Sequence, residues 1–438
     1  MGCRGATRSW PARQEIDSHP HAVDNSLMGS SPRANPLRST PAFRRLWLAR
    51  TISHVGDGIG LVALVLLVQE GRGTGTAVGA LLLASSVPRF LGPLAGIVAD
   101  RVEQRSLMIV CDLGNAAIFA TIAGARPSFG MLLALVAASA ILDTLFAPAG
   151  RSAVPALVHT DDLLQANAWM GTSLNLQVAM GTLLGGALVA ALGVSWTLAF
   201  DALSFALSAL LLVGLPRLRT VRSHRPEGFL AVGREGLAFA WRTRVVRTFV
   251  IVLFLGVAFA AVDNVALVFL IRETLGGGPV AFGLVSAAYG VGMIVASIGL
   301  SVRRIPLVVT ALLLIAWLAT AVGAIGTGLA PLIVVAAVAQ AIGGFGNGLE
   351  NVAADTLIQQ AVPREMLGRV FGLVATAGFG GSTLAYAAGG PLLDLTSPRA
   401  VFLIAGVGIL VVTAFLWIAL RRDVPPSATD LPDRDANV

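Results

Sequence analysis

The sequence has no lysine, although it carries 31 basic side chains in 438 residues, all of them arginine. A Walker A phosphate loop requires a lysine, so an ATP-driven pump of that type is excluded. Cysteine is also scarce: only Cys3 and Cys111 occur, one in a polar tail and one in an apolar segment, and we expect neither a disulfide nor a metal site. The five histidines are scattered, and no H-E-x-x-H motif occurs. We therefore expect a protein that is not an enzyme and holds no cofactor.

Charged residues are few. They make up 13% of the chain, whereas about a quarter is usual in soluble proteins. Hydrophobic residues make up 55%, and the mean hydropathy is +0.80. These values predict a polytopic protein of the lipid bilayer. The net charge of +7 comes from arginines dispersed at the ends of apolar segments, so nucleic-acid binding is not expected.

Apolar segments of roughly 20 residues, the length that spans a bilayer, recur along the chain. They predict an all-α integral membrane protein with twelve transmembrane helices. The predicted spans are 46–68, 77–98, 107–124, 129–149, 167–191, 195–214, 247–270, 281–301, 305–325, 331–350, 369–391 and 399–420.

Polar stretches flank and divide these segments. Residues 1–41 and 423–438 are predicted to be disordered cytoplasmic tails, and Met28 is an alternative start. Residues 215–246 form a predicted cytoplasmic linker. Its second half is expected to lie along the inner membrane surface as a helix, because four apolar residues stand near helical spacing there: Leu230, Val232, Leu237 and Trp241.

The arginines predict the orientation. With these spans, 25 of the 31 arginines fall on one side of the membrane, and only Arg72, Arg126, Arg272 and Arg399 fall on the other. Arginine gathers in cytoplasmic loops. Both termini are therefore predicted to be cytoplasmic. The exclusive use of arginine is typical of a GC-rich bacterial genome, so the expected location is the bacterial inner membrane.

The two halves of the chain repeat. Gly79 and Gly283 begin similar stretches 204 residues apart, and the pair at Gly185 recurs at Gly389 with the same spacing. A duplication of this kind predicts two six-helix bundles, 42–214 and 247–422, with a substrate site between them near the membrane midplane.

The link between the second and third spans carries a motif, Gly96-x-x-x-Asp100-Arg101-x-x-x-Arg105. It resembles the cytoplasmic signature between helices 2 and 3 of the major facilitator superfamily of secondary transporters, although Glu103 replaces a glycine of that signature. The resemblance implies two pseudo-symmetric six-helix bundles. It also implies a cytoplasmic gate in which Asp100 faces the N-terminal end of helix 11 in the outward-facing state. The expected gate residues are Gly96, Asp100, Arg101, Arg105 and Asp143.

Further motifs narrow the resemblance. Phe43-x-x-Leu-Trp-Leu-Ala-Arg50, Val87-Pro88-Arg89 and Ala147-Pro148-Ala149-Gly150-Arg151 are similar to motifs of the bacterial exporter branch that includes enterobactin and macrolide efflux proteins. This resemblance spans roughly residues 42–422 and implies export.

Two features depart from the family pattern. The antiporter signature of helix 5 keeps its packing glycines Gly181, Gly185 and Gly186 but lacks its proline, which leaves the helix kink open. Residues 129–149 lack the arginine that many proton-coupled members carry in helix 4.

Charges inside a membrane are costly and mark functional candidates. Arg50, His54 and Asp57 stand four and three residues apart and share one helix face. Asp57, near the midplane, is the predicted proton-coupling residue, with a structural pairing to Arg89 as the alternative. Arg89 either counters Asp57 or holds an anionic substrate. Asp263, the repeat mate of Asp57, is a second candidate for transport or for a helix cap.

These observations predict a monomeric secondary transporter that exports a small organic molecule, such as a drug, a siderophore or a secondary metabolite. The expected mechanism is alternating access, and the expected partner ions are protons moving in antiport. Proton-coupled uptake is the alternative function, and an integral-membrane enzyme is the more distant one.

Overall fold

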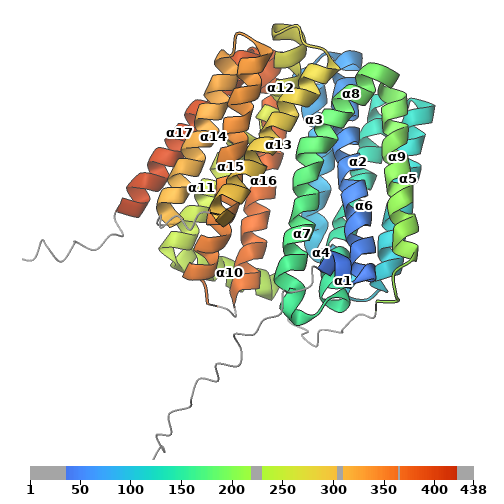
Figure 1. Ribbon diagram of the computed structural model, residues 1–438. Coiled ribbons are helices and arrows are strands. Elements are labelled where there is room, and N and C mark those ends of the chain that lie inside the picture. Colours follow the sequence, from blue (N-terminus) through green and yellow to red (C-terminus); the bar gives the residue numbers. More distant parts are fainter. Residues whose placement is uncertain (1–35, 219–228, 303–308, 364–365, 422–438) are drawn as a thin grey trace, which may run out of the picture. The chain divides into compact units, whose positions relative to one another are not determined.

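The computed structural model describes residues 36–218, 229–302, 309–363 and 366–421, and all statements below concern these residues. Within them every regular element is a helix. The long helices run side by side between two ends of the molecule (Figure 1). We call the end near α12 in that view the upper end and the end near α10 the lower end.

The first half of the chain forms the following elements: α1 (Pro36–Ser39), α2 (Pro41–Arg72), α3 (Gly75–Ser86), the 3₁₀ segment η2 (Val87–Leu91), α4 (Gly92–Ala99), α5 (Gln104–Ala125), α6 (Phe129–Leu157), η3 (Thr160–Asp162), α7 (Leu163–Leu176), the π-helical segment η4 (Gln177–Gly181), α8 (Thr182–Leu192) and α9 (Val194–Val213).

The second half forms α10 (Phe229–Arg242), α11 (Arg244–Ala260), α12 (Asp263–Phe269), the π-helical segment η5 (Leu270–Thr274), α13 (Pro279–Val302), α14 (Val309–Leu329), α15 (Ile333–Ala361), α16 (Leu367–Leu395) and α17 (Pro398–Arg421).

Eleven helices in the described ranges are long and apolar enough to cross a membrane. The remaining predicted span, 77–98, is the second along the chain. It is helical but divided into α3, η2 and α4. Pro88 and Pro93 explain the division, because proline has no N–H to continue the helical hydrogen bonds. The all-helical membrane fold is confirmed, whereas the second span is not one continuous helix.

The duplication recurs in the positions of the helices. α6 and α15 contain 29 residues each and begin 204 residues apart, at Phe129 and Ile333. The same spacing separates the starts of α9 and α17, at Val194 and Pro398. Each half of the chain therefore folds through the same series of helices.

α6 and α15 extend further than predicted. α6 continues to Leu157 with Pro148 inside it, whereas the predicted span ended at residue 149. Asp143 consequently lies at the middle of α6 and not toward its inner end, where the gate assignment had placed it. The hydropathy pattern missed this extension because the lower part of the helix carries polar residues.

A π-helical turn replaces the missing proline of the fifth span. Residues 177–181 form η4 between α7 and α8. The wider turn lets the backbone approach α2 closely, since a Cβ atom at Gly58 would lie 2.3 Å from the carbonyl oxygen of Gln177 and 2.8 Å from the Cα atom of Gly181. Glycine on both helices allows this contact, as is common between membrane helices.

The two halves meet through two equivalent helix pairs, α3 with α16 and α8 with α13. A Cβ atom at Gly79 would lie 2.7 Å from the carbonyl oxygen of Tyr386, and one at Gly283 would lie 2.6 Å from that of Thr182. These four positions correspond at a spacing of 204 residues. The interface therefore has the reciprocal form of a two-fold contact.

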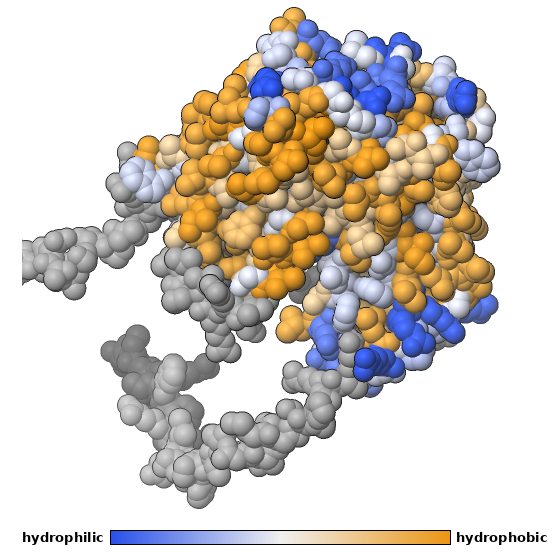
Figure 2. Space-filling view, turned by 45° about the horizontal axis from the view of Figure 1, so that its top comes forward, coloured by the Kyte–Doolittle hydropathy of each residue, from blue (hydrophilic) through white to orange (hydrophobic). Residues whose placement is uncertain are grey.

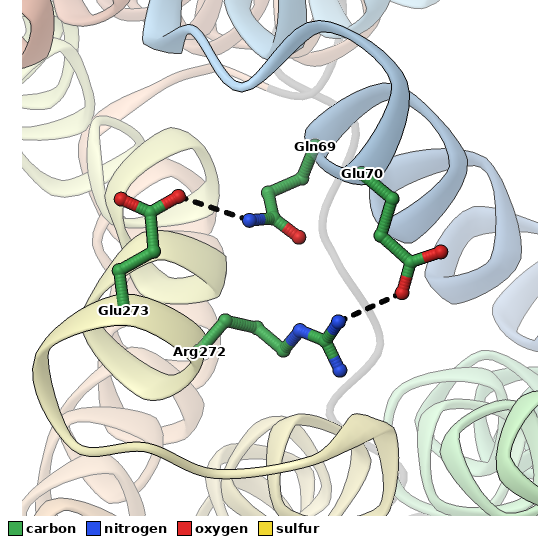
Figure 3. A network of polar contacts seen from close by, with 4 residues as sticks. All are labelled: Gln69, Glu70, Arg272 and Glu273. Carbon is green, nitrogen blue, oxygen red and sulfur yellow. Dashed lines mark hydrogen bonds and ion pairs between the residues drawn. The ribbon is translucent and has the colours of Figure 1, made fainter.

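Polar contacts at the upper end also join the two halves reciprocally (Figure 3). Gln69 donates to Glu273 over 2.9 Å, and Arg272 donates to Glu70 over 2.8 Å. The left-handed glycines that follow α2 and η5, Gly73 and Gly276, stand 203 residues apart and not 204. At this local spacing 69 corresponds to 272 and 70 to 273, so the two contacts are reciprocal.

α5, α9, α14 and α17 contact helices of their own half and present large apolar side chains outward. The exposed side chains on them include Val110, Leu113, Leu203, Leu210, Leu318, Val322, Val407 and Val411. Figure 2 shows an apolar band between polar groups on one face of the molecule. These helices form the surface suited to lipid.

α10 confirms that the second half of the linker is helical. An ion pair between Glu235 and Arg369 joins it to α16, and Ala240 is buried, whereas Leu237 and Trp241 are exposed. The helix therefore lies on the protein with one face and presents two of the four predicted apolar residues on another.

We predict that Gly58→Ala destabilises the protein, because the added methyl group would displace the backbone of η4. Overpacking of this kind costs about 1–3 kcal/mol. Gly124→Ala is the matched control, since Gly124 is also helical but has no atom within 4 Å of an added Cβ. Thermal melting of the two variants in detergent tests the prediction, and equal melting temperatures would contradict it.

Candidate substrate and proton site

A chain of hydrogen bonds starts from Arg50 on α2. Arg50 Nη2 lies 2.5 Å from His54 Nε2, and His54 Nδ1 lies 3.1 Å from Ser173 Oγ on α7. The hydroxyl of Ser173 donates to the carbonyl oxygen of Met170. Because arginine has only donors, His54 Nε2 must accept and Nδ1 must carry the proton. His54 is thus a neutral link between α2 and α7.

Arg50 also lies over the ring of Phe146 on α6, 4.3 Å from its centroid. A cation above an aromatic face is stabilised by the ring quadrupole. His54 and Phe146 therefore hold the guanidinium in place, and its charge stays available to the acids around it. Asp57, Asp112 and Asp143 interact electrostatically with Arg50.

Asp57 is half-buried on α2 between Gly56 and Gly58. Its electrostatic neighbours are Arg50 and the acids Asp143, Asp201 and Asp112. The structure places Arg50, His54 and Asp57 together on α2, as the spacing predicts.

Arg89 takes a different position. Its guanidinium lies 6.0 Å from the ring centroid of Phe379 on α16, and its side chain is exposed. Among the described residues no hydrogen bond or ion pair joins Arg89 to Asp57. The structural pairing of these two residues is absent from this conformation, and Arg89 faces the other half.

Asp201 on α9 is fully buried and fits against α2. A Cβ atom at Gly60 would lie 2.0 Å from Asp201 Oδ2, and one at Gly56 would lie 2.7 Å from Oδ1. Ser204 Oγ is 3.3 Å from Oδ1, and Oδ2 has no hydrogen-bond partner in the described part of the chain. The signal for this contact is Gly56-x-x-x-Gly60, whose two glycines leave room for a carboxylate on the facing helix.

Asp143 on α6 and Asp112 on α5 complete the group of acids. Asp143 Oδ1 accepts a hydrogen bond of 2.8 Å from Asn115 Nδ2 on α5. Asp112 is buried, and its Oδ2 atom lacks a partner among the described residues. Asp143 therefore belongs to the acids around Arg50, whereas we had expected it at the cytoplasmic gate.

Asp263 lies in the second half, at the start of α12. Its Oδ2 atom accepts a hydrogen bond of 2.9 Å from Gln340 Nε2 on α15. A cavity of about 30 Å³ beside it is also lined by Tyr289, Thr320 and Phe402, and this volume is of the order that one water molecule needs. Among the described residues no arginine forms a hydrogen bond or ion pair with Asp263, and its side-chain partner is the neutral amide of Gln340, so the two halves differ in their buried charge.

The turn between α4 and α5 is held to its own half. Glu103 accepts hydrogen bonds from Ser106 N and from Leu218 N, over 2.8 and 2.9 Å, and Arg105 Nη2 donates to the carbonyl oxygen of Val213 over 2.6 Å. Desolvation acts to raise the pKa of Glu103, but the hydrogen bonds from Ser106 and Leu218 outweigh it, and the pKa lies below its ordinary value. Glu103, which departs from the family signature, thus ties the turn to the end of α9.

The remaining predicted gate residues are exposed or have free space beside them in this conformation. Asp100 and Arg101 are exposed, and a Cβ atom at Gly96 would meet nothing within 4 Å. The packing glycines of the fifth span lie at contacts: Gly185 faces Ile59 and Val62, and Gly181 faces Gly58. Gly186 faces Gly283 of the other half.

Several known proteins are similar in sequence to this chain. A family model described as transmembrane secretion effector matches residues 31–434. An uncharacterized MFS-type transporter of Bacillus subtilis, YfiS, is 26% identical over 86% of this chain and 92% of its own length.

Two further relatives carry efflux names. The enterobactin exporter EntS of Citrobacter koseri is 26% identical over 90% of this chain and 96% of its own length. The multidrug efflux pump Tap of Mycobacterium bovis is 27% identical over 89% and 96%.

Solved structures share the fold at low sequence identity. The nucleoside transporter NupG has a TM-score of 0.69 and 14% identity over 87% of this chain and 99% of its own. A bacterial homologue of the human lysosomal transporter Spinster has a TM-score of 0.66 and 17% identity over 89% and 98%. With the family match over most of its length, the chain belongs to the transmembrane secretion effector family of the major facilitator superfamily.

Proposed function

We propose that this transporter exports a small organic molecule from the cytoplasm by alternating access, in exchange for protons. The observation that carries the proposal is a group of four membrane-embedded acids near Arg50. Asp57, Asp112 and Asp143 interact with Arg50, and Asp201 interacts with Asp57. A group with more carboxylates than arginines is suited to take up and release a proton as water access changes.

The direction of transport rests on the relatives. Those named for a known activity include an enterobactin exporter and a multidrug efflux pump, so we assign export of a siderophore, drug or secondary metabolite. The arginine distribution supports a lower end in the cytoplasm. Both termini would then face the cytoplasm of a bacterial inner membrane.

The contacts between the halves support a proposal for the transport motion. We assign residues 42–214 and 247–422 to two six-helix bundles that rock against each other, with 215–246 as a tether. The polar contacts that join the bundles near Gln69 and Arg272 lie at the upper end. With the lower end in the cytoplasm, this conformation is closed toward the outside.

Transport into everted membrane vesicles tests the proposal. A panel of siderophores and drugs is offered to vesicles with and without the protein, before and after the proton gradient is collapsed. We expect protein-dependent accumulation that disappears with the gradient. Accumulation that survives the loss of the gradient would contradict proton coupling, and accumulation in whole cells but not in everted vesicles would indicate uptake.

We predict that Asp57→Asn abolishes accumulation against a gradient but leaves exchange of substrate measurable. The amide keeps the shape of the side chain but cannot carry a proton, so substrate movement is no longer coupled to protons. Accumulation and counterflow in vesicles measure the two activities separately.

Asp161→Asn serves as the control for this variant, because Asp161 is an exposed acid of η3 and its loss should leave both activities unchanged. If Asp57→Asn accumulated substrate like the wild type, Asp57 would have no part in coupling, and Asp263 would become the candidate.

We predict that a bridge between the upper ends of α2 and η5 stops transport. Cysteines at Gln69 and Glu273, whose side chains are in hydrogen-bond contact, are joined by a short bifunctional thiol reagent that reduction cleaves. Rocking requires that these ends separate, so transport should cease on cross-linking and return on reduction. Full transport by the bridged protein would show that the halves do not move apart at this end.

A further inference from the structure

One pair of neighbouring helices connects the two halves over its upper part. α3, η2 and α4 belong to the first half, and α16 belongs to the second. α16 packs mainly against α3 and η2 and runs antiparallel to them. Each of the two chain segments of this helix pair ends near an aspartate: Asp100 follows α4, and Asp394 lies in the last turn of α16. In an antiparallel pair, the acidic end of each helix faces the N-terminal end of the other.

Asp394 is bound to the N-terminal end of α3 in this structure. Its Oδ1 atom accepts from the backbone N–H of Gly75 over 2.5 Å, and its Oδ2 atom accepts from the N–H of Thr76 over 2.9 Å and from Thr76 Oγ1 over 2.5 Å. The first N–H groups of a helix lack partners inside the helix. A carboxylate there is also stabilised by the helix dipole, so Asp394 joins the two halves by charge as well as by hydrogen bonds.

The backbone contact beside Asp394 is close. A Cβ atom at Gly390 would lie 2.7 Å from the Cα atom of Thr76, and further along the pair Ser86 Oγ lies 3.0 Å from Thr383 Oγ1. The upper part of α3 and α16 therefore cannot separate without breaking the bonds to Asp394.

The equivalent helix pair in the other repeat has no such carboxylate. α13 and α8 repeat the close backbone contact, because Gly283 faces Gly186. However, Ala190 stands 204 residues before Asp394, and Pro279, which has no N–H, corresponds to Gly75. The acid is therefore an addition to one of the two contacts and not a requirement of the repeated packing.

The lower end of the same pair is open. Asp100 is exposed and has no hydrogen bond or ion pair through its side chain within the described residues. The first turn of α16 is the N-terminal end that it would face if α4 approached. Closing the lower end by a rocking motion requires that the upper end opens, since both ends belong to the same two helices.

We propose that Asp394 is a latch that holds the conformation seen here by binding the N-terminal end of α3. It is the counterpart, at the opposite end of the same antiparallel helix pair, of the contact that the family resemblance implies for Asp100 with the N-terminal end of α16 in the outward-facing state. Asp394 is engaged in the conformation seen here. This inference rests on the alternating access of the proposed function, and it assigns Asp394 a role in the balance between conformations.

Disulfide formation between cysteines at Ser86 and Thr383 reports the closed upper end. The short distance between their side-chain oxygens suits a disulfide once both are cysteine. Cys3 and Cys111 are replaced by serine and alanine, the full chain is kept in native membranes, and the oxidation rate is followed with neither substrate nor a proton gradient.

We expect Asp394→Asn to slow this cross-linking about fivefold, the effect of roughly 1 kcal/mol at a helix N-terminus. Asp100→Asn should raise the rate or leave it at its maximum, and the double variant should lie between the two single variants. Thr76→Val, which removes one of the three donors, should slow cross-linking less than Asp394→Asn does. Asp161→Asn, which removes a carboxylate far from the pair in sequence, should not change it.

An unchanged rate in Asp394→Asn, or a decrease of equal size in Asp100→Asn, would overturn the inference. The assay needs no transport, so a failure to couple protons at Asp57 leaves its outcome unaffected. Conversely, transport that depends on Asp57 together with an unchanged cross-linking rate in Asp394→Asn would retain the proposed function and reject the latch.

Discussion

Close backbone contact between helices is the constraint on which this structure depends. Helices in a bilayer gain little by exchanging lipid contacts for contacts with each other, so association relies on packing and polar bonds. Gly58 meets Gly181 within one half, and Gly79 and Gly283 make equivalent contacts between the halves. Larger side chains at these positions would separate the helices and move every polar group that the contacts bring together.

The same contacts position the acids of the candidate site. The small residues Gly56 and Gly60 leave space on α2 for the carboxylate of Asp201, while Asp57 lies between them in sequence on another face of the helix. Burial of several acids near one arginine is costly in a bilayer. In the first half, His54 and Phe146 hold Arg50 in place near these acids. In the second half, Asp263 instead accepts a hydrogen bond from the neutral amide of Gln340. The duplicated halves therefore share a fold but differ in charge.

Symmetry and asymmetry have different roles in the interface. The reciprocal contacts of Gln69 with Glu273 and of Arg272 with Glu70 follow from the duplication, because a two-fold arrangement brings each position to its partner twice. The carboxylate of Asp394 does not follow from it. A charge present in only one of two equivalent helix pairs makes the two contacts unequal, so separation of the halves has to break different bonds on each side.

The sequence by itself determined the membrane fold, the repeat spacing of 204 residues and the family resemblance, because hydropathy and local motifs are properties of neighbouring residues. It also placed Arg50, His54 and Asp57 on one helix face. Only the tertiary structure decided that Arg89 faces Phe379, that Asp143 joins the central acids, and that Asp394 binds α3. These outcomes depend on where α6 ends and on which helices of different halves lie side by side. Such contacts join residues up to 319 positions apart, and periodicity along the chain carries no information about them.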